Sequence, residues 1–240
     1  MFLSFIIPAH NEELLLGRTL RAIHQAARAA AEPYEIIVAD DASTDRTAAV
    51  AHEHGARVVR GGHRQIAATR NRGAQEARGD VLIFVDADTL VNEVVVRAAL
   101  RALRAGAAGG GCAFRFDDPV PLYARLLQPV CVRLFRAAGL ACGCFLFCTR
   151  GAFEAAGGFE EGLFAAEEAA MSKALKRQGR FVVLRQGVIT SGRKLRAYSV
   201  WEILRLLGRV ALRPGAVRTR EGLEIWYEER RPDPHCDRGD

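Results

Sequence analysis

Two aspartates close an apolar run in the sequence VLIFVDADT, residues 81–89. Asp is a poor strand former and is costly to desolvate, so Asp86 and Asp88 need a reason to follow five apolar residues. A strand that ends in a turn explains one aspartate easily and the second less well. A cation or phosphate site at the carboxyl end of the strand explains both, because Mg²⁺ and Mn²⁺ take oxygen ligands and commonly bridge to phosphates.

Two further polar clusters follow apolar runs earlier in the chain. PAHNEE (8–13) ends the run LSFIIP (3–8), and DDASTDRT (40–47) follows YEIIVA (34–39). Ser43, Thr44 and Asp45 are typical turn and helix-capping residues. Asp40 and Asp41 come earlier, at the strand exit, where a carboxylate can accept the N–H groups of a nucleobase or cap the next turn.

The elements that must position these clusters alternate between strand-like and helix-like segments. Strands are predicted at 3–8, 34–39, 56–60 and 81–85, with helices between them, one capped by Asn11 and one at 65–78. Near-continuous apolar strands separated by helices predict a parallel sheet covered on both faces. Ligands then bind beyond the carboxyl ends of the strands, so the three clusters should meet at one rim.

After residue 91 the pattern loosens but continues the same α/β domain. We expect a helix at 94–106, a strand at 109–116, a helical stretch at 121–139 interrupted by Pro129, a strand at 144–148 and a helix at 166–179. Half of the 240 residues are hydrophobic, which suits one large domain with a C-terminal helical extension.

The net charge of +6 is concentrated near the C-terminus. Residues 185–220 contain nine basic residues and a single acidic residue, Glu202. The segment 200–213 can form a basic amphipathic helix with Arg205, Arg209 and Arg213 on one face, which suits an anionic membrane, the sheet or a dimer partner. Nucleic acid is not expected, because the basic stretch lacks interleaved aromatic residues for base stacking.

The expected location is the cytoplasm, with peripheral contact at the inner face of the membrane as the alternative that the basic tail leaves open. The opening residues MFLSFIIPAHNEE lack a basic n-region, and no apolar run reaches the roughly 20 residues that a membrane-spanning helix needs. The six cysteines show no metal-binding spacing, and several lie in the apolar run ACGCFLFC (141–148), as expected for a reducing compartment.

Four segments in order resemble one family: PAHNEE, ADDASTDRT, ATRNRGAQEARGDVLIFVDADT and GGFEEGLFAAEE. They look like the family 2 glycosyltransferases of the GT-A fold, over residues 1–195. The resemblance implies an inverting transfer of a sugar from a nucleotide-diphosphate donor, most commonly a UDP-sugar, to an acceptor hydroxyl, with Mg²⁺ or Mn²⁺. It implies a nucleotide-binding half (1–90), an acceptor and catalytic half (91–195) and a basic extension (196–240). The acceptor, lipid-linked or glycan, is not indicated.

The resemblance also implies roles for individual residues. Glu168 would be the general base, within the pair Glu167–Glu168, although the family usually has aspartate at this position and a further acid where this chain has Ala170. Asp88 would bind the metal, and Asp86 would approach the metal or the ribose. The residues that would bind the nucleotide are Pro8, Ala9, Asn11, Glu12, Asp40, Asp41, Arg70, Asn71 and, in the segment SGRK (191–194), Arg193.

Two alternatives remain open from the sequence. DADT also fits the DxDxT nucleophile motif of haloacid-dehalogenase-like phosphatases, but three strands precede it here and the two upstream clusters would then have no role. A nucleotide-sugar binding module without catalytic activity is the other alternative, suggested by Ala170.

Overall fold

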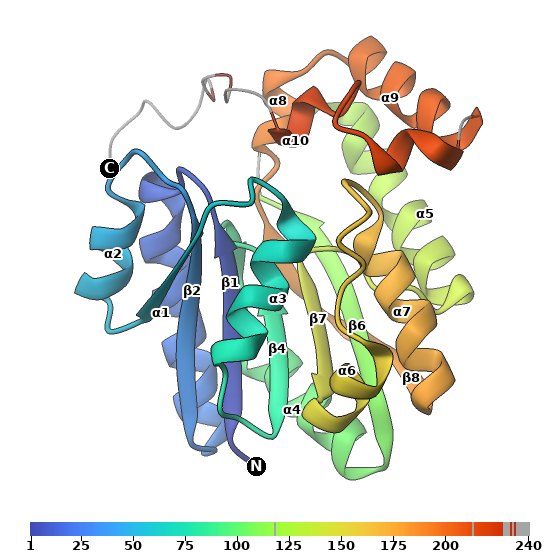
Figure 1. The fold of residues 1–240 in the computed structure, drawn as a ribbon. Helices are drawn as coiled ribbons and strands as arrows, with labels where there is room; N and C mark the ends of the chain where they lie inside the picture. Colours follow the sequence, from blue (N-terminus) through green and yellow to red (C-terminus); the bar gives the residue numbers. More distant parts are fainter. Residues whose placement is uncertain (118, 213, 228–230, 232, 234–240) are drawn as a thin grey trace.

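The computed structural model describes residues 1–117, 119–212, 214–227, 231 and 233, and it contains one sheet between helices (Figure 1). Eight strands form this sheet in the order β3-β2-β1-β4-β7-β6-β8-β5. Of the seven neighbouring pairs, four are parallel (β1–β2, β1–β4, β2–β3 and β6–β8), and three are antiparallel. The predicted α/β fold with a mostly parallel sheet is therefore confirmed.

The first half of the chain supplies the parallel part. Its elements are β1 (Leu3–Ala9), α1 (Glu13–Ala30), β2 (Tyr34–Asp41), α2 (Thr47–Glu53), β3 (Arg57–Gly61), α3 (Ile66–Glu76) and β4 (Val81–Val85). All four predicted strands are present, within one or two residues of the expected ends. Because these strands run in the same direction, their carboxyl ends share one edge of the sheet, which we call the rim.

The second half adds an antiparallel strand and a distant parallel pair. Its elements are β5 (Thr89–Leu90), α4 (Glu93–Arg104), β6 (Ala107–Phe116), α5 (Leu122–Ala138), β7 (Phe145–Thr149), α6 (Arg150–Ala156), α7 (Glu167–Gln178) and β8 (Arg180–Thr190). Pro129 lies inside α5, so the expected interruption is wrong. Pro129 is exposed, and the backbone groups freed by its missing N–H can reach water.

Alternation along β1 explains why helices cover both faces. Leu3, Phe5 and Ile7 belong to one apolar core, together with residues of α1 and α4. Ile6 belongs to a second core, with residues of α3, α6 and α7. Because successive strand side chains point to opposite faces, a fully apolar strand needs cover on both sides.

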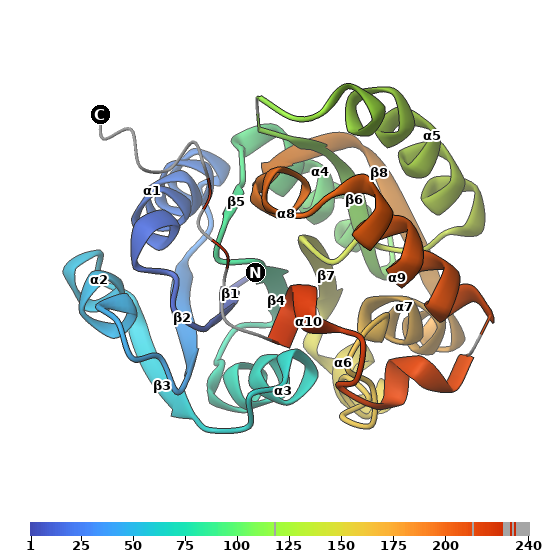
Figure 2. The same ribbon diagram turned by 90° about the horizontal axis from the view of Figure 1, so that it is seen from above.

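The C-terminal residues form α8 (Arg193–Ala197), α9 (Val200–Leu212), the 3₁₀ helix η1 (Pro214–Arg218) and α10 (Glu224–Tyr227). Seen from above, they lie across the rim (Figure 2). Leu223 is buried, and the Arg220 guanidinium donates to the carbonyls of His63 and Arg64 just before α3. The expected boundary between residues 195 and 196 falls inside α8.

The extension was also expected to present arginines on one helix face. Arg205 and Arg209 lie in α9, and Arg213 lies outside the described residues. Across the part of the chain that the structure describes, none of the helices combines the length and the apolar character needed to cross a bilayer.

Candidate active site

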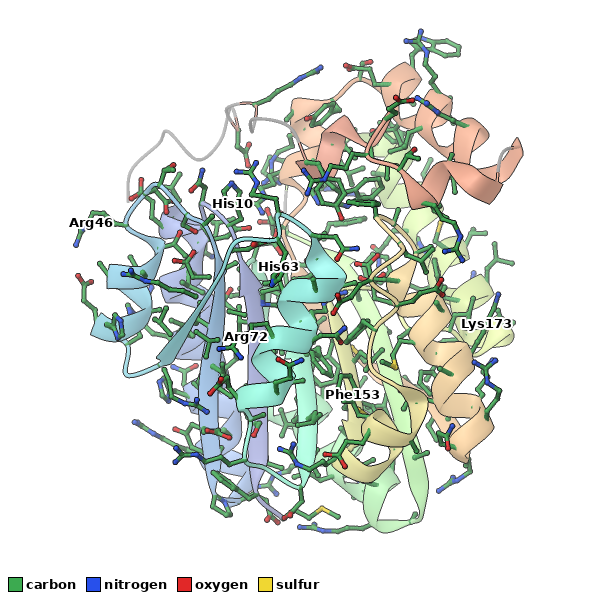
Figure 3. The ribbon with its side chains drawn as sticks, viewed as in Figure 1. His10, Arg46, His63, Arg72, Phe153 and Lys173 are labelled. Atoms are coloured by element: carbon green, nitrogen blue, oxygen red, sulfur yellow. The ribbon has the colours of Figure 1, made fainter. Side chains whose placement is uncertain are left out.

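The three polar clusters meet at the rim, as the strand pattern predicted. In Figure 3, His10 and His63 lie at the rim end of the sheet, while Phe153 lies toward the opposite end. The β1–β2 register pairs Ala9 with Asp40 and brings the two clusters side by side. The amide of Glu12 donates to the Thr47 hydroxyl at 2.7 Å, and the two loops are bonded to each other before any ligand arrives.

Asn11 does not cap α1, contrary to expectation. The helix begins at Glu13, and Asn11 has a positive φ of 51°. Its side-chain oxygen instead accepts from the backbone N–H of Thr44 at 2.8 Å, and its own N–H donates to the Ser43 hydroxyl at 3.0 Å. Asn tolerates the left-handed conformation better than most residues, so it suits this loop-to-loop contact.

Asp40 and Asp41 are buried and both stabilise turns. Asp41 accepts from the backbone N–H groups of Arg64 and Gln65 and from the Thr69 hydroxyl, at 2.8 to 2.9 Å. Asp40 accepts from the N–H of Ser43 at 3.1 Å. Asp40 thus caps the turn that follows β2, whereas Asp41 holds the start of α3 and the loop before it. Their roles toward a nucleoside stay predictions.

Arg70 is the centre of the candidate site. Only 2% of its side chain is exposed, and its Nη2 donates to Asp86 at 2.8 Å and to the carbonyl of Gly143 at 3.1 Å. Its Nη1 donates to Glu167 at 3.1 Å and to Glu168 at 2.8 Å. One guanidinium thus links the aspartate after β4 to both carboxylates at the start of α7.

The two glutamates differ in their proton affinity. Burial raises the pKa of Glu167 to about 8, and the neighbouring negative charge of Glu168 acts in the same direction. Burial also acts to raise the pKa of Glu168, but the charge and hydrogen bond of Arg70 outweigh it and hold this pKa below its ordinary value. Within the pair, Glu167 therefore holds a proton more readily than Glu168.

Asn71 fixes the loop that leads to this pair. Its amide nitrogen donates to the carbonyl of Phe159 at 2.9 Å and to Glu161 at 2.8 Å, and its oxygen accepts from the N–H of Phe159 at 2.8 Å. Gly158 has a φ of +76°, and a Cβ there would lie 2.9 Å from the Asn71 oxygen. Asn71 was expected near the nucleotide, and here its amide binds the loop 158–161.

Asp86 and Asp88 both face basic side chains. Burial raises the pKa of Asp86 to about 6 against the opposing charge of Arg70, although 35% of the side chain is exposed. Asp88 lies 3.0 Å from Nη2 of Arg193, which also forms a two-point ion pair with Glu12 at 2.7 and 2.8 Å. A cavity of about 20 Å³ borders Asp88, between residues of α1, β5 and β8.

Several residues of the site gave no sequence signal. Gln65 caps α3, donating to the carbonyl of Leu163 at 2.9 Å while its oxygen accepts from the N–H of Ala68. Gln is not a usual capping residue, so sequence rules miss it. Tyr227 from α10 donates to the carbonyl of Phe164, and Lys194 lies over the Trp226 ring at 5.4 Å. Burial lowers the pKa of Lys194, against the charge of Asp88. Only the folded chain brings these side chains to the rim.

The carboxylates of Asp86 and Asp88 are suitable ligands for a hard cation, but two carboxylates are too few to hold one alone. Asp86 and Asp88 offer the oxygen donors that Mg²⁺ and Mn²⁺ prefer. Within residues 1–117 and the other described segments, no three His, Cys, Asp or Glu side chains form a group that could hold a metal ion. Any metal here would need further ligands from a substrate or from water.

A parallel half-sheet joined to a mixed half, with carboxylates at the junction, defines the GT-A class of fold. Solved structures of this class align closely with the chain. A mannosyltransferase from Pyrobaculum calidifontis, in complex with GDP-Man and Mn²⁺, has a TM-score of 0.68 at 19% identity, over 98% of this chain and 68% of that one. Residues 1–349 of TarS from S. aureus with UDP give 0.63 at 18% identity, over 94% and 70%.

The family model described as "Glycosyl transferase family 2" matches residues 4–151, more than half of the chain. The chain therefore belongs to glycosyl transferase family 2, as the motifs indicated. The matched part includes Arg70, Asp86 and Asp88, whereas Glu167 and Glu168 lie beyond it.

Curated relatives match over a shorter length. A validoxylamine A glucosyltransferase from Streptomyces hygroscopicus subsp. limoneus is 34% identical over 130 residues, which is 50% of this chain and 28% of that protein. An undecaprenyl-phosphate 4-deoxy-4-formamido-L-arabinose transferase from Pseudomonas paraeruginosa is 38% identical over 96 residues, 35% and 27% of the two chains. These matches span less than a third of the relatives' own length.

Proposed function

We propose that the protein is an inverting glycosyltransferase that moves a sugar from a nucleotide-diphosphate donor, a UDP-sugar in the first instance, to an acceptor hydroxyl. One observation carries the proposal: Arg70 holds Asp86 of the Asp-X-Asp motif and the Glu167–Glu168 pair around a single buried guanidinium. The groups proposed to activate the donor and to remove the acceptor's proton would thereby be held at fixed positions relative to each other. The family membership supports the same reaction class.

The donor diphosphate is expected beside Asp86 and Asp88. A divalent cation, Mg²⁺ or Mn²⁺, held by these carboxylates and the diphosphate would offset the charge that develops on the leaving phosphate. The solved neighbours with Mn²⁺ bound support a metal of this kind. Pro8, Ala9, Asn11, Asp40 and Asp41 are proposed to border the nucleoside, since they line the adjoining edge of the rim.

Glu168 is the proposed general base. Inversion in one displacement needs a single base near the acceptor hydroxyl and no covalent nucleophile. Arg70 favours the ionised form of Glu168, so Glu168 can accept the hydroxyl proton, while burial makes Glu167 hold a proton more readily. Arg70 therefore acts as a positioning residue, because it orients Glu168 and sets its charge.

Arg193 is proposed to take the diphosphate when the donor binds. Its guanidinium forms ion pairs with Asp88 and Glu12 in this arrangement, and the cavity that borders Asp88 measures only about 20 Å³. Arginine binds carboxylate and phosphate with the same two-point geometry, so a modest shift of α8 would exchange one partner for the other.

The acceptor is proposed only as a chemical class, and the location only as a cellular compartment. The relative from Pseudomonas paraeruginosa is named for undecaprenyl phosphate, which supports a lipid-linked acceptor here. A cytoplasmic protein with peripheral contact at the inner face of the membrane fits such an acceptor. The catalytically inactive binding module stays the second candidate, favoured by Ala170, whereas membership of family 2 sets the phosphatase alternative aside.

The test is a thermal-shift screen with UDP, GDP, CDP and dTDP, with and without Mn²⁺, followed by donor hydrolysis assays. A ligand that binds only the native state raises the melting temperature, and its stabilisation grows with the logarithm of one plus the ratio of ligand concentration to Kd. We expect one nucleotide to stabilise the protein, and to do so only with the metal. Stabilisation without donor hydrolysis or transfer would favour the binding module, and no stabilisation by any nucleotide would contradict both.

A further inference from the structure

Helix α5 presents an apolar stripe that the fold does not cover. Leu122, Leu126, Val130 and Leu134 follow one another at i, i+4 spacing, and each is between 46% and 69% exposed. Of all residues in α5, only Ala124 is buried. Residues four apart lie on one side of a helix, so these side chains form a continuous row along its outer surface. A stripe of this kind indicates an interaction site.

The charges of α5 have one sign. The helix carries Arg125, Arg133 and Arg136 and no acidic residue. At about 100° per residue, these arginines project along one edge of the apolar stripe. Neither Arg133 nor Arg136 makes a side-chain hydrogen bond or ion pair with a described residue, so the fold does not use their charge.

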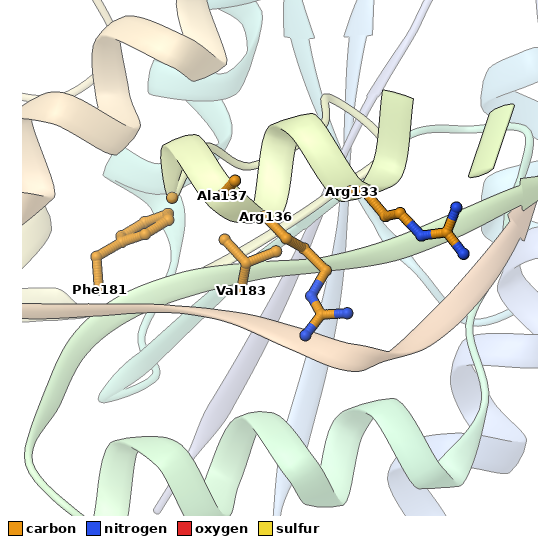
Figure 4. Close-up of a pocket in the computed structure, with 6 residues that line it drawn as sticks. Arg133, Arg136, Ala137, Phe181 and Val183 are labelled. Atoms are coloured by element: carbon orange, nitrogen blue, oxygen red, sulfur yellow. The ribbon is translucent and has the colours of Figure 1, made fainter. Parts of the chain in front are cut away.

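A cavity of about 390 Å³ opens along the same edge (Figure 4). Arg133 and Arg136 line it from α5, while Phe181 and Val183 line it from β8. An anionic lipid has a phosphate and a hydrocarbon chain. The two guanidinium groups can bind the phosphate, and the two apolar side chains can contact the start of the hydrocarbon chain.

Helix α9 lies on the same side of the molecule as α5, above it in Figure 1. Trp201 is 74% exposed and Leu204 is about half exposed, and Arg205 follows them. Tryptophan is the residue that most favours the boundary between water and lipid.

A second copy of the chain suits the α5 surface less well. A two-fold contact sets the same patch against itself, so each basic edge would face a helix that has no carboxylate to pair with it. An anionic bilayer complements both the apolar row and the arginines.

We propose that α5 docks in the plane of an anionic lipid bilayer, with Leu122, Leu126, Val130 and Leu134 in the outer part of the leaflet and Arg133 and Arg136 at lipid phosphates. The mode is that of an interfacial amphipathic helix. The contact is a property of the surface alone and does not depend on sugar transfer.

The test is cosedimentation of the purified protein, without nucleotide, with phosphatidylglycerol/phosphatidylcholine vesicles and with phosphatidylcholine vesicles. We expect binding to the anionic vesicles that falls as salt rises. A triple variant, Leu126→Ser, Val130→Ser and Leu134→Ser, should bind at least about tenfold more weakly, because three apolar side chains leave the leaflet. These positions are exposed, so the fold should persist, as circular dichroism can check.

The matched control places the same kind of change elsewhere. Leu14 in α1 and Val94 in α4 are 71% and 58% exposed, and Leu14→Ser with Val94→Ser should leave vesicle binding unchanged. For charge, Arg133→Ser with Arg136→Ser should weaken binding more than Arg60→Ser with Arg101→Ser, which removes the same charge from exposed positions of β3 and α4.

Four results would overturn the proposal. The first is no binding to anionic vesicles at low salt. The second is equal weakening by the control pairs, which would indicate net charge alone. The third is loss of binding by Trp201→Ser with Leu204→Ser while the α5 variants still bind, which would assign the contact to α9. The fourth is a wild-type dimer in size-exclusion chromatography that the triple variant converts to a monomer, which would assign α5 to a second copy.

Discussion

Arg70 and Glu168 form an ion pair of 2.8 Å, although 98 residues separate them in the sequence. The pair joins α3, within the family-matched part of the chain, to the first turn of α7, which lies beyond that part. The position of the proposed base is thus fixed by a residue from the first half of the chain.

Replacing Arg70 should destabilise the protein strongly. Arg70→Met leaves Asp86, Glu167 and Glu168 without their shared cation in a buried place, and the loss of one partner of a buried ion pair typically costs about 3 to 5 kcal/mol. Urea unfolding followed by circular dichroism measures this. Arg72→Met on the same helix is the control, because Arg72 pairs with Glu76 at an exposed site and should cost less than about 1 kcal/mol. Equal costs for the two variants would contradict the central role of Arg70.

Glu168→Gln should separate catalysis from binding. The amide cannot accept the acceptor's proton, so we expect the transfer rate to fall about 10²-fold or more while nucleotide affinity is retained. Glu167→Gln should have a smaller effect on the rate, because burial raises the pKa of Glu167 and makes it the weaker candidate for the ionised base. Single-turnover transfer, once donor and acceptor are identified, gives both rates. Near-normal turnover in Glu168→Gln would move the base to another carboxylate of the rim.

Asp88→Ala should abolish the stabilisation that Mn²⁺ adds to nucleotide binding, because the metal loses a carboxylate ligand. The same thermal-shift measurement on Glu154→Ala provides the control, since Glu154 is an exposed acid on α6, away from the rim. If the Asp88 variant binds the metal–nucleotide complex as tightly as the wild type, the Asp-X-Asp assignment is wrong.

Metal-dependent nucleotide binding should weaken in mild acid. The pKa of Asp86 is raised to about 6, so its carboxylate becomes protonated as pH falls through that value and protons compete with the cation. At pH 5 about a tenth of the groups stay ionised, and we expect roughly tenfold weaker binding than at pH 7.5. In the ligand-free protein the sign is opposite: the raised pKa stabilises the fold at low pH, and this contribution is lost as pH rises through about 6. Titration calorimetry at both pH values, repeated with Asp86→Asn, checks the binding effect; an equal pH dependence in that variant would assign it to another group.

Gly158 and Gly157 form a matched pair for the loop before α7. Both have a positive φ, so alanine pays about 1 kcal/mol or more for the left-handed conformation at either position. At Gly158 the new Cβ would press on the Asn71 oxygen. A Cβ added at Gly157 would meet no atom within 4 Å. Gly158→Ala should therefore lower the free energy of unfolding more than Gly157→Ala, measured in urea. Equal losses would show that the loop adapts without disturbing Asn71.

The strand and rim pattern could be predicted from sequence because it depends on local rules. Apolar runs of strand length and polar residues after them are enough to place Asp40, Asp86 and Asp88 at one edge. The partners of Arg70 could not be predicted that way, because nothing local in ATRNRG indicates that this guanidinium is buried among carboxylates from two other segments.

Asn11 and Asn71 illustrate the same limit. The Asn11 oxygen accepts from the backbone of Thr44, and the Asn71 amide bonds the backbone of Phe159. A polar residue near a site gives the same sequence signal whether it holds a loop or a ligand. The exposed stripe of α5 was likewise hidden, since an apolar helix reads as a core helix until its neighbours are known.

The first two turns of α3, with Gln65 just before them, contact several separate segments at the rim, and this bears on how the chain can evolve. Gln65 and Thr69 meet Asp41 and the loop before α7, Arg70 meets Asp86 and the glutamates, and Asn71 meets the loop at 158–161. Replacing Arg70 disturbs contacts with three distant segments at once, whereas replacing Thr69 or Asn71 disturbs contacts with one, so any compensation must come from other parts of the chain. Drift in this family should therefore be slow along the buried side of α3 and free on its solvent side, even though both lie within one short helix.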